Sequence, residues 1–318
     1  MDGSGGGIAR GAGRYAPSPS GDLHLGNLRT AMLAWLFARG TGRAFLMRIE
    51  DTDRGRDAGA ASQQLSDLAE IGIEWDGEPV VQSGRIAEHE AAIARLADTG
   101  LVYECTCTRR EILEAPSAPH APPGAYPGTC RDRTPEERAE ARRRIAPRRP
   151  ALRLRAPEGL RELEFDDLVL GRVTGAVDDL VLRRGDGAIA YNLAVVVDDA
   201  AMGVDQVVRG DDLAPSTPRQ ILLQRLLGLP SPPEVEYAHV PLVLGPSGAR
   251  LAKRDGAVTL ADLGRRGSGA EEVRTMLAAS LGLADPGERV TMEDLLERFD
   301  PAALPRRPWV WSPVEGER

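Results

Sequence analysis

The sequence is almost free of lysine. It has 40 basic residues, and Lys253 is the only lysine among them, while all the others are arginine. Asparagine is nearly as rare, since it occurs only as Asn27 and Asn192. The abundance of Ala, Arg, Gly and Pro indicates a GC-rich coding sequence, which replaces lysine by arginine and can leave one lysine by accident. The alternative is that these three positions need particular side chains, because all of them fall inside motif-like segments.

Other scarcities exclude whole classes of protein. Three cysteines are too few, and odd in number, for a disulfide framework, so we expect a reducing, cytoplasmic setting. No run of about 18 apolar residues occurs, which excludes an ordinary membrane-spanning helix. The net charge of −8 argues against a broadly basic nucleic-acid binder but leaves room for a local basic face. Residues 1–13 are glycine-rich, so we expect a flexible tail there rather than a signal peptide.

Strand-like and helix-like segments alternate along most of the chain, which predicts an α/β fold. The alternation breaks where Cys, Pro and Arg accumulate. We therefore expect a Rossmann-type parallel nucleotide-binding sheet, split by an insertion and followed by a small, mostly helical domain. The expected boundaries are 14–104 and 176–229 for the two halves of the sheet, 105–175 for the insertion and 230–318 for the helical domain. Within them we expect helices at 28–39, 62–73, 85–100 and 217–228 and strands at 44–51 and 101–105, with Thr217 as an N-cap.

The stretch HLGN follows a short strand and a Pro/Gly loop, and it precedes the first expected helix. A helix N-terminus offers unpaired N–H groups and the positive end of the helix dipole to a phosphate. His24 and Asn27 add donors for phosphate oxygens, and Gly26 lacks a side chain, so that an adenine ring can lie on the backbone. Taken alone, four such residues are also typical of a turn with a solvated histidine.

Five segments, which follow one another along the chain, make the prediction of a phosphate site more specific. RYAPSPSGDLHLGNLRTA, which begins at Arg14, closely resembles the first signature of class I glutamyl-tRNA synthetases, and HLGN resembles their HIGH element. RIEDTDR, YNLAVVVDD and VRGDDL follow in the order of that family, and RLAKRDGAV contains a match to its KMSKS element. The resemblance covers roughly residues 14–260. The sequence departs from the motifs at Asn27, where HIGH has its second histidine, and at Ala252, where KMSKS has serine.

Only about 60 residues follow the KMSKS-like element, too few for the anticodon-binding region of a full glutamyl-tRNA synthetase. Together with CTC…YPGTC and YNLAVVVDD, this length resembles the truncated paralogous family, the glutamyl-Q tRNA(Asp) synthetases. The resemblance implies activation of L-glutamate by ATP with Mg²⁺, without tRNA, and transfer to the queuosine base in the anticodon of tRNA(Asp) by a monomer without membrane contact. The rival predictions are a compact glutamyl-tRNA synthetase that charges a 3′ end and a non-catalytic tRNA-binding paralogue. The HIGH-like and KMSKS-like elements argue against the second rival.

The resemblance also implies the residues of a glutamate pocket. Arg14 and Arg209 would bind carboxylates, for which a guanidinium fork is suited. Glu50 would bind the ammonium group, and Lys253, in a stem-contact-like domain, would bind the leaving pyrophosphate. An ordinary ion pair for each arginine, and a strand-end cap for Glu50, are the alternatives. Ser18 and Tyr191 would complete the pocket, with backbone contributed by Tyr15, Ala16 and Pro17.

Cys105, Cys107 and Cys130 form a second constellation. C-x-C followed by Y-x-x-x-C is typical of a small knuckle that clamps one structural zinc, since three thiolates and one more ligand give a tetrahedral site. His120 is the commoner type of fourth ligand, whereas the resemblance through YPGTC implies Tyr126. Three free, buried cysteines are the alternative.

Two charged segments complete the sequence-based predictions. Residues 131–155 contain ten arginines against four acids, which is typical either of a solvated helix with many ion pairs or of a contact with an RNA backbone. The pairs Asp198/Asp199 and Asp211/Asp212 are expected to be strand-end caps without a chemical role.

Overall fold

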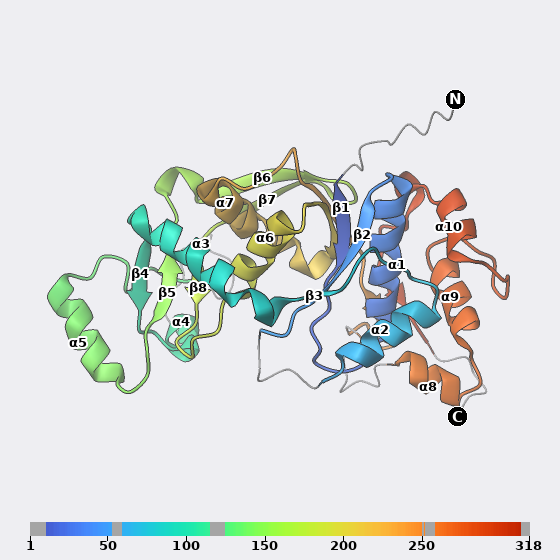
Figure 1. Ribbon diagram of the computed structural model, residues 1–318, viewed down its shortest axis with the longest axis horizontal. Helices are drawn as coiled ribbons and strands as arrows, with labels where there is room; N and C mark the ends of the chain where they lie inside the picture. The colour runs from blue at the N-terminus through green and yellow to red at the C-terminus, as the bar shows by residue number, and fades with distance from the viewer. Residues whose placement is uncertain (1–10, 53–58, 115–124, 250, 252–257, 313–318) are drawn as a thin grey trace.

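The computed structural model describes residues 11–52, 59–114, 125–249, 251 and 258–312. Its centre is a seven-stranded sheet, in which all neighbouring strands are parallel except the last pair, the hairpin of β6 and β7 (Figure 1). The expected α/β fold with a parallel sheet is therefore confirmed. In spatial order the strands are β3 (Val80–Val81), β2 (Ala44–Ile49), β1 (Ala12–Tyr15), β9 (Val204–Gly210), β10 (Glu236–Val240), β6 (Glu162–Asp167) and β7 (Gly171–Ala176).

Helices cover both faces of this sheet. Successive side chains of a strand point to opposite faces, and apolar side chains on both faces pack against the helices. Val207 and Tyr237 pack in one apolar core with helices of one face, whereas their neighbours Val208 and Ala238 pack in the other core. The first face carries α3 (Ile86–Asp98), α6 (Tyr191–Ala201) and α7 (Thr217–Leu227), and the second carries α1 (Leu25–Gly40) and α2 (Ala61–Glu70).

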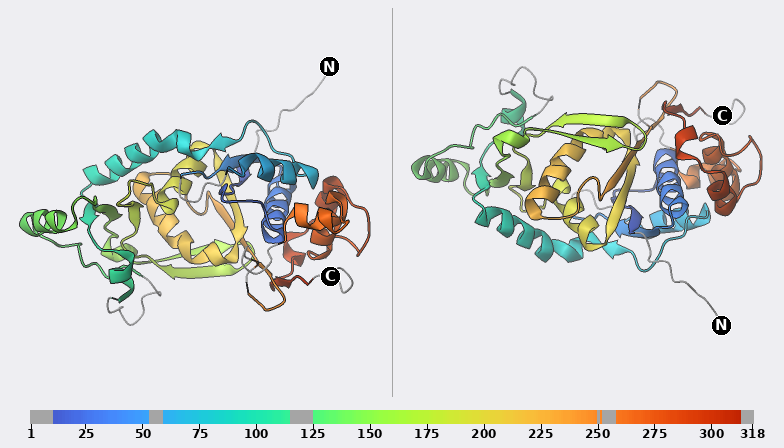
Figure 2. Two further views of the ribbon diagram at one scale, coloured as in Figure 1. Left: turned by 90° about the horizontal axis from the view of Figure 1, so that it is seen from below. Right: turned by 90° about the horizontal axis from the view of Figure 1, so that it is seen from above.

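The insertion forms a separate three-stranded antiparallel sheet. Its helix α5 (Pro135–Ile145) lies at the end of the molecule farthest from α9 (Ala270–Ala279) and α10 (Met292–Arg298) (Figure 2). Two strand assignments differ from expectation. Residues 102–105 belong to this small sheet instead of the nucleotide-binding sheet, and 162–176 belong to the large sheet. The insertion contains β4 (Val102–Cys105), β5 (Ala151–Leu154), β8 (Val181–Arg183), α4 (Arg109–Glu114), α5 (Pro135–Ile145) and the turn η2 (Glu158–Leu160).

The C-terminal part is mostly helical, as expected, but it begins later than residue 230, because β10 is still a strand of the large sheet. Its helices α9 and α10 contact α1. It contains β11 (Val243–Leu244), paired in parallel with β12 (Trp309–Val310), and the helices α8 (Leu260–Arg265), α9 (Ala270–Ala279), α10 (Met292–Arg298) and η5 (Pro301–Ala303). Within the described part of the chain, no helix has both the length and the apolar character needed to cross a bilayer.

Helix ends also differ in detail. α1 begins at Leu25, earlier than the expected 28, because His24 caps it. Thr217 is wrong as an N-cap: it is already helical, since the 3₁₀ turn η3 (Asp211–Ser216) leads directly into α7, and its hydroxyl accepts a hydrogen bond from Arg209. Pro218 lies in the first turn of α7, where a missing N–H costs nothing.

Candidate functional site

A cleft of about 770 Å³ opens at the carboxyl ends of β1, β2 and β9. This is the edge at which parallel sheets bind ligands. The predicted glutamate- and ATP-site residues meet here, except Lys253, which lies outside the described residues. Those that line the cleft are Arg14, Tyr15, Ala16, Pro17, Ser18, His24, Gly26, Asn27, Glu50, Tyr191 and Arg209.

At the nucleotide end of the cleft, His24 caps α1. Its Nδ1 accepts the backbone N–H groups of Gly26 and Asn27, at 3.1 and 3.3 Å, and the side-chain oxygen of Asn27 accepts the N–H of His24 at 3.2 Å. The expected unpaired N–H groups at this helix end are therefore already partnered. Because Nδ1 is an acceptor, the imidazole proton sits on Nε2. Nε2–H of His24 and the side-chain amide of Asn27 lie at this same end of the cleft.

Gly26 has a second reason to be glycine besides room for a ligand. A Cβ at this position would lie 3.0 Å from Cε1 and 3.1 Å from Nδ1 of the His24 ring, closer than carbon atoms normally approach. A side chain at Gly26 would therefore push the capping ring away from the helix end.

The described residues on either side of the Lys253 segment lie beside this helix end and the cleft wall. Before the segment, the N–H of Leu251 bonds to the carbonyl of Val243, a residue of the cleft wall, at 3.4 Å. After it, the carbonyl of Val258 accepts the N–H of Leu25 at 3.0 Å, and Thr259 forms a β-bridge with His24. The HIGH-like segment is thus joined by main-chain hydrogen bonds to Val258 and Thr259, which follow the KMSKS-like element.

Behind the cleft, Asp199 holds two arginines. Its carboxylate accepts hydrogen bonds from Nε and Nη2 of Arg14, both at 3.1 Å, and from Nη1 of Arg48 at 2.6 Å. Arg48 also bonds to Glu50 at 2.9 Å, so the two acids and two arginines form one buried network. The expectation that Asp198 and Asp199 are strand-end caps is wrong, because both lie in α6, where Asp198 binds other partners.

Asp198 links α6 to α3 and the turn η1 (Gln82–Arg85). It is fully buried, and it contacts Gln82 at 2.8 Å, Arg85 at 2.7 Å and His89 at 2.8 Å. Gln82 also lines the cleft, and its side-chain oxygen accepts a hydrogen bond from Thr52 at 3.1 Å. The helical spacing of YNLAVVVDD could have indicated that its two acids lie on a buried helix face.

Arg209 is held differently from Arg14. Its Nη2 donates to Thr217 at 2.7 Å and to Gln220 at 2.8 Å, its Nε to His239 at 3.1 Å and its Nη1 to Tyr191 at 3.5 Å. All four partners are neutral when His239 is neutral, and no carboxylate of the described residues pairs with this buried guanidinium. Its charge is therefore available to an anionic ligand in the cleft.

Sequence reasoning did not single out several further residues of the cleft wall, some of which lie inside the quoted motifs. Thr52 lies in RIEDTDR, Gln82 in η1 and Arg184 directly after β8, and Asp212 was noticed only as an expected strand-end acid. The others are Thr30, Val181, Ile189, Ala190, Val208, Gly210, Leu213, Leu242 and Val243.

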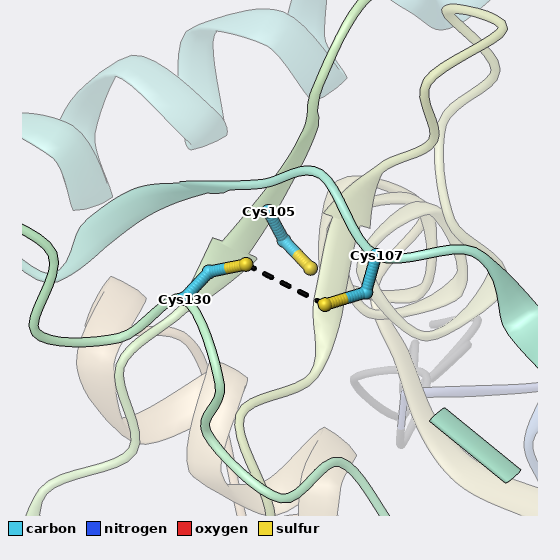
Figure 3. Close-up of side chains that lie close together, drawn as sticks. All are labelled: Cys105, Cys107 and Cys130. Atoms are coloured by element: carbon cyan, nitrogen blue, oxygen red, sulfur yellow. Dashed lines mark hydrogen bonds between the residues drawn. The ribbon is translucent and has the colours of Figure 1, made fainter. Parts of the chain in front are cut away.

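The three cysteines meet in the insertion, far along the chain from the cleft (Figure 3). Their sulfur atoms all lie within 4.8 Å of one another, and those of Cys107 and Cys130 are 3.5 Å apart. The phenol oxygen of Tyr126 lies 3.4 Å from Sγ of Cys105 and 4.0 Å from Sγ of Cys107. His120 lies outside the described residues.

This arrangement fits a tetrahedral zinc ion. Zn–S bonds of about 2.3 Å place two sulfur ligands roughly 3.8 Å apart, close to the spacing observed here. Hydrogen bonding with Cys105 and Cys130, and their charges, raise the pKa of the Cys107 thiol, so three thiolates cannot persist together without a cation. The ring of Tyr126 stacks on the guanidinium of Arg153 with the ring centroid 3.7 Å from Cζ, and its hydroxyl lies beside the thiols.

The arginine-rich segment 131–155 forms many ion pairs. Arg131 binds Asp179 at 2.6 Å, and on α5 Arg143 binds Glu140 at 2.5 Å. Arg142 reaches from α5 to Glu104 on β4, also at 2.5 Å. These contacts agree with the expected ion-paired helix, and α5 is exposed apart from the buried Ala141 and the half-buried Ile145. The alternative, a contact with RNA, stays a prediction.

The family model for the catalytic domain of class I tRNA synthetases (E and Q) matches residues 12–312. A glutamyl-Q tRNA(Asp) synthetase of Nocardia farcinica is 63% identical over 300 residues, which cover 94% of this chain and 93% of that protein. A glutamyl-Q tRNA(Asp) synthetase of Symbiobacterium thermophilum is 49% identical over 311 residues, covering 93% of this chain and 94% of that protein. A solved glutamate tRNA ligase from Elizabethkingia meningosepticum, in complex with its amino acid, has a TM-score of 0.78 at 27% identity and matches 96% of this chain and 67% of its own.

Proposed function

Because this chain belongs to the class I tRNA synthetases of the glutamate and glutamine group, and within it to the glutamyl-Q tRNA(Asp) synthetases, we propose that it activates L-glutamate with ATP in the absence of tRNA and transfers it to the queuosine base of tRNA(Asp). The family makes it a ligase that activates glutamate and joins it to tRNA. The independence from tRNA and the modified base are the proposed refinements, and the 63% identity over nearly the whole length of a relative with this name supports them.

The cleft supports the activation step. A carboxylate oxygen of glutamate attacks the α-phosphate of ATP, which forms glutamyl-adenylate and releases pyrophosphate. Arg209, whose charge no described carboxylate neutralises, binds one carboxylate of the substrate, and Arg14 binds the other with the Nη1 that Asp199 leaves over. Glu50 binds the ammonium group. Ser18 supports this end, since its hydroxyl bonds to the carbonyl of Glu50 at 3.1 Å.

The other end of the cleft would receive ATP, which class I synthetases use with Mg²⁺. His24 and Asn27 donate hydrogen bonds on the α-phosphate side, where charge develops during the attack, and Gly26 keeps the wall open. Lys253 neutralises the leaving pyrophosphate. In the second step a hydroxyl of the queuosine cis-diol attacks the activated carbonyl of glutamate, so that an ester forms and AMP leaves.

We also propose that Cys105, Cys107, Cys130 and Tyr126 hold one zinc ion. Four protein ligands leave no open position on the metal, so the ion would be structural. It would tie the end of β4 to the loop before α5 and so stabilise the insertion.

The decisive experiment separates the two possible acceptors. Radiolabelled glutamate and ATP are supplied with tRNA(Asp) that carries queuosine, with the same tRNA after enzymatic removal of its 3′ adenosine, and with tRNA(Asp) that lacks queuosine. We expect full labelling of the first two and none of the third. Labelling that disappears with the 3′ adenosine would instead identify a compact glutamyl-tRNA synthetase, and the absence of any ATP–pyrophosphate exchange would favour a non-catalytic paralogue.

A further inference from the structure

A buried histidine stands directly behind Arg209. His239 lies on β10 and has no exposed surface. Its Nε2 receives the Nε–H of Arg209 at 3.1 Å, and its Nδ1 lies 2.6 Å from a carboxylate oxygen of Asp167, at the end of β6. The three side chains form a chain of contacts that runs from the interior of the sheet to the cleft.

The carboxylate of Asp167 is fixed by the backbone. It accepts N–H groups from Val169 and Leu170 at 2.9 Å and from His239 at 3.1 Å. Although burial raises it, hydrogen bonds and the neighbouring imidazole hold the pKa of Asp167 below its usual value. An ionised carboxylate only accepts hydrogen bonds, so the proton between Asp167 and His239 belongs to Nδ1 of the imidazole.

The contact with Arg209 requires the same tautomer. A guanidinium only donates, so Nε2 of His239 has to present its lone pair. An imidazolium would carry a proton on Nε2 and would turn this contact into a clash between two donors and two positive charges. Burial, together with the charge of Arg209, lowers the pKa of His239 in spite of Asp167.

The remaining anchors of Arg209 support this arrangement. Gln220 turns its oxygen toward Arg209 because its amide nitrogen donates to Asn192 at 3.1 Å. Nε and Nη2 of Arg209 are therefore occupied from the protein side, while Nη1 is next to Tyr191 in the cleft. Thr217 and Gln220 fix the Nη2 side of the guanidinium, and His239 is the anchor that fixes its Nε side.

We propose that His239 is a positioning residue that holds Arg209 ready for a substrate carboxylate and makes the binding of glutamate sensitive to acid. The inference rests on the proposed role of Arg209 in binding glutamate. The charged and titratable groups that face the ring are Asp167, Arg209, Asp211 and Tyr237. Because protonation of His239 is favoured at low pH, the affinity for glutamate is full above its pKa and falls as the pH drops through it.

Two substitutions separate the contact of Nδ1 with Asp167 from the contacts of Nε2, which lies 3.1 Å from the hydroxyl of Thr217 as well as from Nε of Arg209. His239→Asn keeps a donor near the position of Nδ1 for Asp167 but removes the acceptor for Arg209, whereas His239→Gln can place an amide oxygen near the position of Nε2. Losing a hydrogen bond to a charged group lowers the binding affinity by about ten- to a hundredfold. We therefore expect His239→Asn to weaken glutamate binding by that factor, His239→Gln to recover much of it, and the affinity for ATP to stay unchanged in both.

Calorimetric titration of the full chain with glutamate measures this affinity directly and needs no tRNA. Because the pKa of His239 lies below the ordinary imidazole value of 6.5, the dissociation constant of the parent protein should stay constant above about pH 6.5 and rise as the pH is lowered further, whereas in His239→Gln it should stay flat. The comparison of the parent protein with His239→Gln tests the inference even if His239→Asn does not fold. A parent affinity that is independent of pH, or a His239→Asn variant that binds like the parent, would overturn the inference.

Arg209→Met distinguishes failure of this inference from failure of the proposed function. If Arg209→Met weakens glutamate binding and the histidine variants do not, Arg209 binds glutamate without help from His239. If Arg209→Met binds glutamate as tightly as the parent, the proposed role of Arg209 is wrong, and the inference fails with it.

Discussion

Asp199→Asn should reveal how much the buried charges behind the cleft contribute to the free energy of unfolding. Asp199 and its partner side chains Arg14 and Arg48 are almost inaccessible to solvent, with exposed side-chain fractions of 11, 5 and 0%. Removing one member of a buried ion pair costs about 3–5 kcal/mol, because the charge left behind stays desolvated. Arg48 keeps Glu50 as a partner, so we expect the lower end of that range.

The assay is thermal unfolding followed by calorimetry and by tryptophan fluorescence. A loss of about 3 kcal/mol lowers the unfolding midpoint of a domain of this class by roughly 6–12 °C. Asp166→Asn is the matched control, because it removes the same charge from an exposed pair with Arg172, at 3.1 Å. That pair should contribute less than about 1 kcal/mol. Equal midpoints for the two asparagine variants would refute the argument from burial.

The pH dependence gives an independent check of the same residue. Burial raises the pKa of the Asp199 carboxyl, but the charges of Arg14 and Arg48 hold it below its ordinary value of 3.8. A carboxyl with a lowered folded-state pKa stabilises the fold fully above the unfolded-state pKa and loses this contribution as the pH falls. The difference in stability between the parent and Asp199→Asn should therefore be constant from pH 7 to about 5 and shrink below about pH 4.

Much of the fold could be predicted from local patterns. The helix 85–100 was expected from its apolar spacing, and the structure has it at Ile86–Asp98. The strand 101–105 was also recognised, but its sheet was not, because strand partners are chosen by tertiary contacts. Val102 pairs with Leu154 across the insertion, and nothing near either residue in the sequence specifies the other.

In the candidate site, too, the tertiary contacts could not be predicted from local sequence patterns. The motifs identified Arg14 and Arg209 equally well, and the sequence could not distinguish their environments. Arg14 meets Asp199 across 185 positions of chain, whereas the partners of Arg209 are neutral groups that come from α6, α7 and β10. In a chain with so many arginines, only the fold determines which of them keep a charge for a ligand.

Two further predictions concern the metal and the single lysine. Elemental analysis should find about one zinc per chain, which Cys130→Ser and Tyr126→Phe lower and His120→Ala does not; a metal-free protein that folds normally would contradict the zinc site. Lys253→Arg should keep the net charge and the unfolding midpoint but slow glutamate-dependent ATP–pyrophosphate exchange at least about tenfold, mainly through kcat. A lysine ammonium is a compact charge on a long stem, whereas a planar guanidinium cannot occupy the same gap between phosphate oxygens. The described ends of the segment are bonded to Val243 and Leu25, at the nucleotide end of the cleft. If Lys253→Arg exchanges pyrophosphate as fast as the parent, coding bias rather than phosphate chemistry explains why this lysine stands alone.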